Sequence, residues 1–72
     1  MTKLGLYLAK KSINKAKVSR KTGISASRLS ELTLKDNTKL RADELYLIAL
    51  AIDVNPAELL MFVCVDLKLV QD

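Results

Sequence analysis

Two short helical patterns separated by a single glycine constrain this chain more than any other feature of its sequence. The first runs from Lys15 to Thr22 and the second from Ala26 to about Thr33, with Gly23 between them. Asn14 and Ser25 stand immediately before these segments, where a short polar side chain caps the free N–H groups of a helix. Gly23 is the residue type that can adopt the positive φ that ends a helix. A tight turn therefore joins two helices of about two turns each.

Packing two helices at so short a turn makes demands that the sequence meets. Val18 turns inward from the first helix, and Ser19 beside it is small enough for the second helix to cross over it. Ile24 fills the inside of the turn, while Leu29 and Leu32 form the buried face of the second helix. These choices are typical of a helix-turn-helix, in which the axes cross at about 90 to 120°. A simple corner between two helices of a bundle is the alternative.

Three further helices are predicted around this pair. Apolar residues recur at helical spacing over Lys3–Ser12 and over Arg41–Ile52, which indicates an amphipathic helix in each segment. Asn55 as a cap and Pro56 as the first helical residue begin a fifth helix, which we expect to reach about Val63. A chain of 72 residues holds one domain at most. The predicted fold class is therefore all-α, a five-helix domain with a short C-terminal extension.

The end of the chain allows two interpretations. Every second residue from 61 to 69 is apolar, as in a strand with one buried face, although part of the pattern also fits a helical face. The β-branched content and the charges on the opposite face favour a short strand over residues 66–70. We therefore expect a helix-turn-helix domain over residues 1–64 and a C-terminal tail over residues 65–72.

Charge is divided unevenly along the chain. The net charge is +4, yet residues 1–41 carry +9 and residues 42–72 carry −5. A positive field in one half of a small domain attracts a polyanion such as DNA, although a solvated lysine-rich surface has the same composition. The chain has no histidine and one cysteine, Cys64, so it cannot build a Cys/His zinc site or a Ser–His or Cys–His catalytic pair. We expect neither an enzyme nor a cofactor.

Several features together predict a cytoplasmic protein. No apolar run approaches the roughly 18 residues of a membrane span. Lysines interrupt the N-terminal segment MTKLGLYLAKK, where a signal peptide is apolar. One unpaired thiol is typical of a reducing compartment. We expect no membrane partner and no small-molecule ligand, because so short a chain leaves no room for a ligand-binding domain.

The outward face of the second short helix suits a DNA groove. With Leu29 and Leu32 inward, helical geometry turns Ser27 and Glu31 outward, and no exposed apolar side chain larger than that of Ala26 interrupts this face. A slim helix with short polar side chains fits a major groove about 12 Å wide. Basic residues precede and follow the helix in sequence, where phosphate contacts would set its register. They are Lys15, Lys17, Arg20, Lys21, Lys35, Lys39 and Arg41.

The chain from Leu4 to Leu60 resembles a Cro/C1-type helix-turn-helix domain, the five-helix family of phage repressors and bacterial regulators. The motifs that carry the resemblance are specific in their order and spacing. They are INK at residues 13–15, Val18-Ser19, Gly23-Ile24-Ser25, Leu29-Ser30-Glu31-Leu32 and ELYLIALAIDVNPAELL at residues 44–60. The resemblance implies sequence-specific binding of double-stranded DNA by a homodimer on a palindromic operator.

Residue by residue, the resemblance implies two kinds of DNA contact. Base reading falls to Ala26, Ser27 and Glu31. Contacts to the DNA backbone fall to Asn14, Lys15, Lys17, Arg28, Lys35, Asn37, Thr38 and Lys39. Other roles stay open: Ser27 also suits the start of a helix, Glu31 is spaced for an ion pair with Arg28 or Lys35, and each lysine also serves solubility.

Three positions depart from the family's pattern. Lys15 replaces a common glutamine at the start of the second helix, which favours a plain phosphate contact there. Ala26 replaces a polar residue that commonly reads bases at this position, so the only base contact expected from it is with a thymine methyl group. The run from Thr33 to Lys35 replaces the usual Glu-x-Gly ending of the third helix, so the following loop need not keep the family's geometry.

The tail is the predicted dimer interface, because the basic face repels its own copy and is occupied by DNA. Its apolar residues exceed what a terminal segment needs, and a strand edge invites pairing with a two-fold mate. They are Phe62, Val63, Val65, Leu67, Leu69 and Val70. The function expected from these features is that of a transcriptional regulator, a repressor. The alternatives are a helix-turn-helix protein-interaction module and the antitoxin subunit of a two-gene module.

Overall fold

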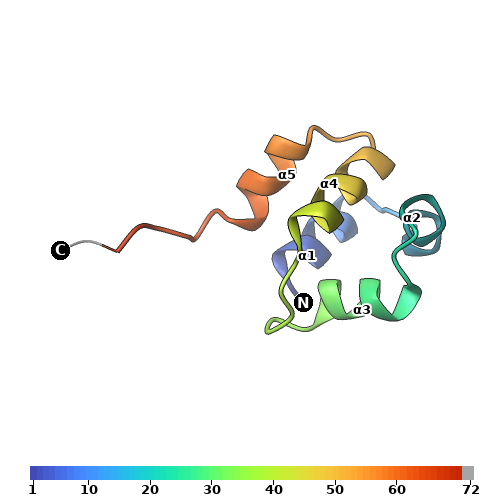
Figure 1. The fold of residues 1–72 in the computed structure, drawn as a ribbon, viewed down its shortest axis with the longest axis horizontal. Helices are drawn as coiled ribbons and strands as arrows, with labels where there is room; N and C mark the ends of the chain where they lie inside the picture. Colours follow the sequence, from blue (N-terminus) through green and yellow to red (C-terminus); the bar gives the residue numbers. More distant parts are fainter. Residues whose placement is uncertain (71–72) are drawn as a thin grey trace.

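The computed structural model describes residues 1–70, which form five helices joined by short loops and followed by a tail (Figure 1). In this range α1 packs on α3 and α5, α2 packs on α3 and α4, and α4 packs on α5. None of these helices has the length and apolar character that a membrane crossing requires. The all-α prediction is confirmed. The helices are α1 (Lys3–Lys10), α2 (Lys15–Thr22), α3 (Ala26–Leu34), α4 (Ala42–Ala51) and α5 (Pro56–Val63).

Polar side chains begin four of the helices by accepting a hydrogen bond from a backbone N–H of the first turn. Three of these caps were predicted, and Pro56 follows the last of them at the first helical position, as expected. Gly23 ends α2 in the left-handed conformation with a φ of 80°. The capping residues are Thr2, Asn14, Ser25 and Asn55.

Apolar side chains from all five helices meet in one core. Val18, Leu29 and Leu32 face it, as the helix-turn-helix interpretation requires. Ile13 and Ile24 pack against its edge from the two turns that flank α2. The other buried members are Leu4, Tyr7, Leu8, Leu45, Ile48, Ala49 and Leu59.

α1 approaches the end of α3 so closely that only glycine fits at residue 5. A Cβ added to Gly5 would collide with the carbonyl oxygen of Thr33. The N–H of Thr2 donates to that same oxygen at 2.9 Å, and the Thr2 hydroxyl donates to the Leu32 carbonyl at 2.7 Å. These bonds satisfy carbonyls that the end of a helix leaves without intrahelical partners. They anchor the start of the chain to the end of α3.

Two sequence predictions need correction. α1 ends at Lys10 rather than Ser12, because Ser12 adopts a φ of 55° and the N–H of Ile13 bonds back to the Leu8 carbonyl at 3.0 Å. The short strand over residues 66–70 is not formed, since a strand needs a second strand to pair with and the described residues contain none.

The described part of the tail begins as a turn and then leaves the helical body (Figure 1). The N–H of Leu67 donates to the Cys64 carbonyl at 2.9 Å, and the carboxylate of Asp66 pairs with Lys3 of α1 at 2.7 Å. The tail therefore keeps contact with α1 as far as residue 66. Residues 71 and 72 of the predicted tail lie outside the described residues.

Candidate nucleic-acid interface

Hydrogen bonds fix the turn between α2 and α3. The N–H of Gly23 donates to the Ser19 carbonyl at 3.0 Å. The Ser19 hydroxyl donates to the Ile24 carbonyl at 2.6 Å, and the Ile24 N–H donates to the Thr22 hydroxyl at 3.1 Å. Sequence reasoning chose Ser19 for its small size alone and missed its hydrogen bond. This bond holds the first residues of the turn to α2 and so fixes where α3 begins.

α3 presents a mostly polar side to solvent, although Leu34 at its end is also exposed, contrary to the prediction that no large apolar side chain interrupts this face. The three predicted base readers, Ala26, Ser27 and Glu31, are exposed, whereas Leu29 and Leu32 are buried on the opposite side. Ser27 and Glu31 are four residues apart and share a face of the helix, whereas Ala26 lies beside that face at the first position of α3. The ion pairs considered for Glu31 are absent from the described part of the chain. Its carboxylate therefore faces solvent.

The residues predicted to contact the DNA backbone at the start of α2 differ in their surroundings. The side chain of Asn14 caps the helix by accepting from the Lys17 N–H at 3.2 Å. Lys15 is joined to α3, because its Nζ donates to the hydroxyl of Thr33 at 3.3 Å. Thr33 is fully buried and also donates to the Leu29 carbonyl at 3.0 Å. The departures from the family pattern at residues 15 and 33 are thus in contact with each other.

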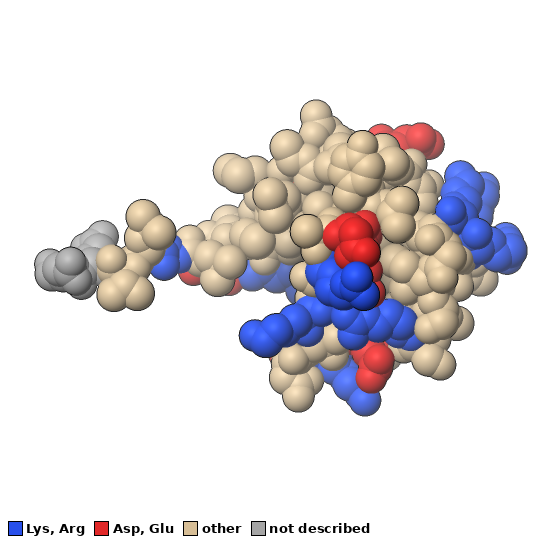
Figure 2. Space-filling model, in the orientation of Figure 1, with Lys and Arg blue, Asp and Glu red and all other residues tan. Residues whose placement is uncertain are grey.

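The loop between α3 and α4 carries the remaining predicted backbone contacts. Lys35, Asn37 and Lys39 are exposed, and Thr38 is half-buried. The N–H of Thr38 donates to the Lys35 carbonyl at 3.1 Å, which closes a tight turn. Figure 2 shows basic side chains gathered over α2 and over the region of α3 and this loop, with acidic side chains among the second group. The face over α5 in the same view is mostly uncharged.

Arg28 is joined to α4. Its Nε donates to Oε2 of Glu44 at 2.9 Å, and its Nη2 donates to Oε1 at 3.0 Å. Nη2 also donates to the carbonyl of Lys39 at 3.0 Å. The Glu44 side chain is 9% exposed and that of Arg28 is 33% exposed. The guanidinium that sequence reasoning assigned to DNA therefore already has protein partners.

The electrostatics of this pair agree with its geometry. The hydrogen bonds from Arg28 lower the pKa of Glu44, burial opposes them, and the bond from the Arg41 N–H lowers the pKa further. The pKa of Arg28 is raised, chiefly by its hydrogen bonds to Glu44. Both groups therefore stay charged at neutral pH.

Glu44 is the residue of this region that sequence reasoning missed. Its Oε1 accepts from the N–H of Arg41 at 2.9 Å, at the residue that precedes α4. A glutamate three residues after a cap commonly reaches back in this way, so the spacing of the two residues carried a signal for this bond. The bond to Arg28 lies across sixteen residues of sequence and had no comparable signal.

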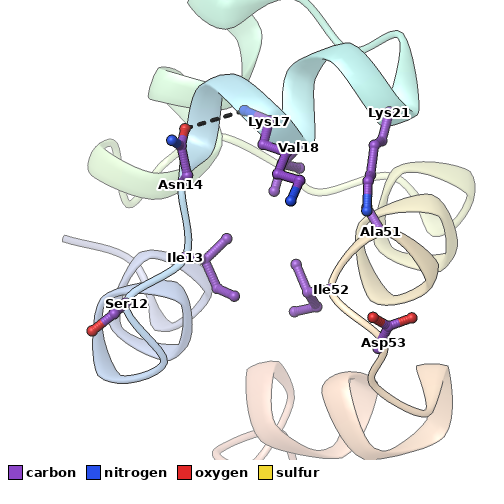
Figure 3. A pocket seen from close by; sticks show the side chains of 9 residues that line it. All are labelled: Ser12, Ile13, Asn14, Lys17, Val18, Lys21, Ala51, Ile52 and Asp53. Carbon is purple, nitrogen blue, oxygen red and sulfur yellow. Dashed lines mark hydrogen bonds between the residues drawn. The ribbon is translucent and has the colours of Figure 1, made fainter.

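A shallow cleft of about 330 Å³ lies between α2 and the end of α4 (Figure 3). Lys21 extends from α2 toward Ala51 at the end of α4, and Asp53 follows beyond it. A lysine near the C-terminus of a helix interacts favourably with the free carbonyl groups there. The cleft also contains Lys17 and the capping residue Asn14, so it borders the start of α2.

The predicted dimer residues divide into two groups. Phe62 and Val63 are half-buried and pack against the core, with the ring of Phe62 lying 5.1 Å from that of Tyr7 in an edge-on arrangement. The other four are exposed, and further exposed apolar side chains on α4 and α5 were not predicted. The tail residues are Val65, Leu67, Leu69 and Val70, and the helical ones are Tyr46, Leu47, Leu50, Leu60 and Met61.

Comparison with known proteins agrees with this geometry. A family model described as a Cro/C1-type HTH DNA-binding domain matches residues 3–64, a range that contains all five described helices. Neither the curated proteins nor the solved structures gave a match to the chain. The family match confirms the resemblance inferred from the motifs. The chain belongs to the Cro/C1-type helix-turn-helix family of DNA-binding domains.

Proposed function

We propose that this chain is a transcriptional repressor that binds a palindromic operator in double-stranded DNA as a homodimer. The observation that carries the proposal is the exposed polar face of α3, which lies opposite its buried leucines. Ala26, Ser27 and Glu31 on this face read base edges in the major groove. Backbone contacts come from the start of α2 and from the loop after α3. They are Asn14, Lys15, Lys17, Lys35, Asn37, Thr38 and Lys39.

Selection of binding sites from random duplexes tests this function directly. The expected result is one enriched sequence with two-fold symmetry and half-sites about 34 Å apart, because a dimer places two recognition helices one helical turn apart. A gel shift with the enriched duplex at about 50 mM salt then measures affinity. No binding to any duplex at this salt concentration contradicts the DNA-binding function in full. Enrichment without symmetry contradicts only the dimer.

Single substitutions separate base reading from backbone contact. Glu31→Ala is expected to relax preference at one base pair of each half-site by about 1 to 3 kcal/mol. Lys39→Ala is expected to weaken binding to all sequences about equally and to reduce the salt slope. Full specificity in the Glu31 variant, together with altered specificity in the Lys39 variant, would reverse the assignment.

The proposed dimer interface is the exposed apolar surface of the tail and of α5. Val65, Leu67 and Leu69 continue the apolar side chains of Leu60 and Met61 along one segment of chain. Apolar surface of this kind, away from the recognition helix, is typical of an interface between subunits. Phe62 and Val63 are half-buried against the core, and their exposed parts extend the proposed interface.

Sedimentation of the full chain at tens of micromolar tests the dimer. We expect Leu67→Asp and Leu69→Asp to produce a monomer, because a buried charge at an interface is costly. Leu6→Asp is the matched control, since Leu6 is also an exposed apolar residue but lies on α1. A wild-type monomer with and without DNA would mean that the tail serves only its own subunit.

The same exposed apolar surface favours a second candidate, the antitoxin subunit of a two-gene module or another protein-interaction module. In that case the surface binds a different protein rather than a second copy. Co-purification with the product of the neighbouring gene distinguishes the two functions. The cytoplasmic location and the lack of a cofactor stay predictions.

A further inference from the structure

The backbones of α3 and α4 do not pack against each other within the described residues. α3 packs on α1 and α2, whereas α4 packs on α2 and α5. The loop between them, residues 35–41, carries four of the residues proposed to contact the DNA backbone. Leu40 of this loop packs against the shared core, but apolar packing is nondirectional and α3 and α4 do not contact each other through their backbones. A directional side-chain link adds the constraint on the position of the loop relative to the recognition helix.

Arg28 and Glu44 form that link. The N–H of Arg28 donates to the Ser25 hydroxyl at 3.1 Å, which ties its backbone to the cap of α3. Its guanidinium holds both carboxylate oxygens of Glu44 and the carbonyl of Lys39. Oε1 of Glu44 in turn accepts from the Arg41 N–H. One ion pair thus joins the start of α3, the end of the loop and the start of α4.

The geometry of this pair resists substitution. A planar guanidinium that donates two parallel bonds to a carboxylate fixes both distance and orientation, which a lysine ammonium cannot do. The Glu44 carboxylate is largely removed from water, so loss of its hydrogen-bond donors would leave a buried charge without a partner, which is costly. Nε and Nη2, two of the three guanidinium nitrogens, donate within the protein. Arg28 also directly follows the proposed base reader Ser27.

We propose that Arg28 is a positioning residue, which together with Glu44 sets the separation between the base-reading face of α3 and the backbone-contacting loop, and is not itself a phosphate contact. This inference rests on the proposed DNA-binding function. It predicts that Arg28 and Glu44 act as a unit, although one is basic and the other acidic. A phosphate contact predicts the opposite for Glu44, because removing an acid beside DNA strengthens binding.

Salt titrations of DNA binding by full-length variants test the proposal. The variants are Arg28→Gln, Arg28→Lys, Glu44→Gln and the double variant Arg28→Gln/Glu44→Gln, with Lys39→Gln as the matched control. The probes are the duplex enriched by selection and a scrambled duplex of equal length. Circular dichroism and thermal unfolding first establish which variants are folded at the temperature of measurement, and folded variants alone are compared.

Each single variant at Arg28 or Glu44 is expected to lose roughly 5- to 150-fold in affinity for the selected duplex, which is the loss expected when one base reader is misplaced. Affinity for the scrambled duplex should change little, so the ratio of the two affinities falls. A merely stabilising role would leave this ratio unchanged. The salt slope should stay at the wild-type value, whereas Lys39→Gln reduces its magnitude by about 0.9 for each phosphate that is no longer neutralised. The double variant should bind no worse than Arg28→Gln alone.

Three results would overturn the inference. They are a salt slope reduced in Arg28→Gln as in Lys39→Gln, wild-type affinity in Arg28→Lys, and unchanged or tighter binding by Glu44→Gln. If Arg28→Gln does not fold, Arg28→Lys and the nearly isosteric Glu44→Gln decide the question by the same criteria. Failure of the wild-type chain to bind either duplex would instead contradict the proposed function, so the two failures are distinct.

Discussion

In the α1–α3 half of the domain, side-chain hydrogen bonds join neighbouring helices, whereas apolar side chains join α4 to α5. Thr2, Lys15 and Ser19 each donate a side-chain bond to another helix or to the turn that follows their own. Between α4 and α5 the described residues contain no side-chain hydrogen bond, and Ile48 and Leu59 are fully buried there.

The two halves differ in how precisely they fix the relative positions of their helices. A hydrogen bond fixes distance and direction within narrow limits, while apolar burial is nondirectional and scales with area. The α1–α3 half contains the turn and the recognition helix, whose position has to match a duplex. The α4–α5 half supplies core area and leaves apolar side chains exposed. The Arg28–Glu44 pair extends the directional contacts of the first half onto the second.

The largest expected effect is the salt dependence of DNA binding, because the two halves also differ in net charge. If the proposed dimer makes about 6 to 10 phosphate contacts, affinity for the selected duplex should fall roughly 10³- to 10⁵-fold between about 50 and 200 mM salt. A fluorescence anisotropy titration measures this slope. Glu58→Lys adds a positive charge to α5 and should leave the slope nearly unchanged. A flat salt response would remove the charge difference between the halves as an explanation of binding.

Apolar burial in the second half predicts the next effect. Ile48→Ala should lower the free energy of unfolding by about 2 to 5 kcal/mol, because truncating a fully buried side chain leaves a cavity. Leu50→Ala is the control on the same helix, since Leu50 is 51% exposed, and it should change stability by about 0.5 kcal/mol or less. Urea unfolding measures both. Equal losses would mean that burial does not hold this half together.

Two glycines of the first half should respond differently to the same substitutions. Gly5→Ala should cost about 1 to 3 kcal/mol in unfolding free energy by overpacking against Thr33, although alanine has the better helix propensity. At residue 23 an added Cβ has open space, but the backbone has a positive φ that alanine disfavours. Gly23→Ala should therefore lower the free energy of unfolding by about 1 to 2 kcal/mol.

Asparagine separates the two causes, because it tolerates the left-handed conformation but is larger than alanine. Gly23→Asn should therefore recover part of the stability lost in Gly23→Ala. Gly5→Asn should be worse than Gly5→Ala. Recovery at residue 5 would show that space between α1 and α3 is not the constraint.

The smallest expected effect is the pH dependence of the link between the halves. Because the pKa of Glu44 is lowered in the folded protein, its contribution to stability is fully present above the unfolded value of about 4.5 and is lost as pH falls through the folded value. The difference in melting temperature between the wild-type chain and Glu44→Gln should therefore shrink as pH falls below about 4.5. Asp66→Asn, which breaks an exposed ion pair, is the control and should change the melting temperature little at neutral pH.

Local features explain which parts of the fold could be predicted from sequence. Asn14, Ser25 and Asn55 begin their helices through contacts within three residues, so their signals are contained in short segments. Ser12 misled the prediction for α1, since a left-handed serine is uncommon. The strand in the tail failed for a different reason: alternation describes one strand and says nothing about a partner.

The contacts that define the candidate site were less accessible to sequence reasoning. The exposed side of α3 followed from helical periodicity, because Leu29 and Leu32 fix which side is buried. The pairs Arg28–Glu44 and Lys15–Thr33 join separate helices over sixteen and eighteen residues, and no local rule specifies them. Their identification needs the tertiary arrangement, which local propensity does not supply.

The exposure of the proposed base readers of α3 has a consequence for how this protein can diversify. In the described part of the chain, the side chains of Ala26, Ser27 and Glu31 are outside the core, and no side-chain hydrogen bond engages them. Random variation at these positions can therefore proceed almost independently of folding. A library confined to them would sample new operator preferences on an unaltered scaffold, and regulators that arise by gene duplication can diverge by the same route.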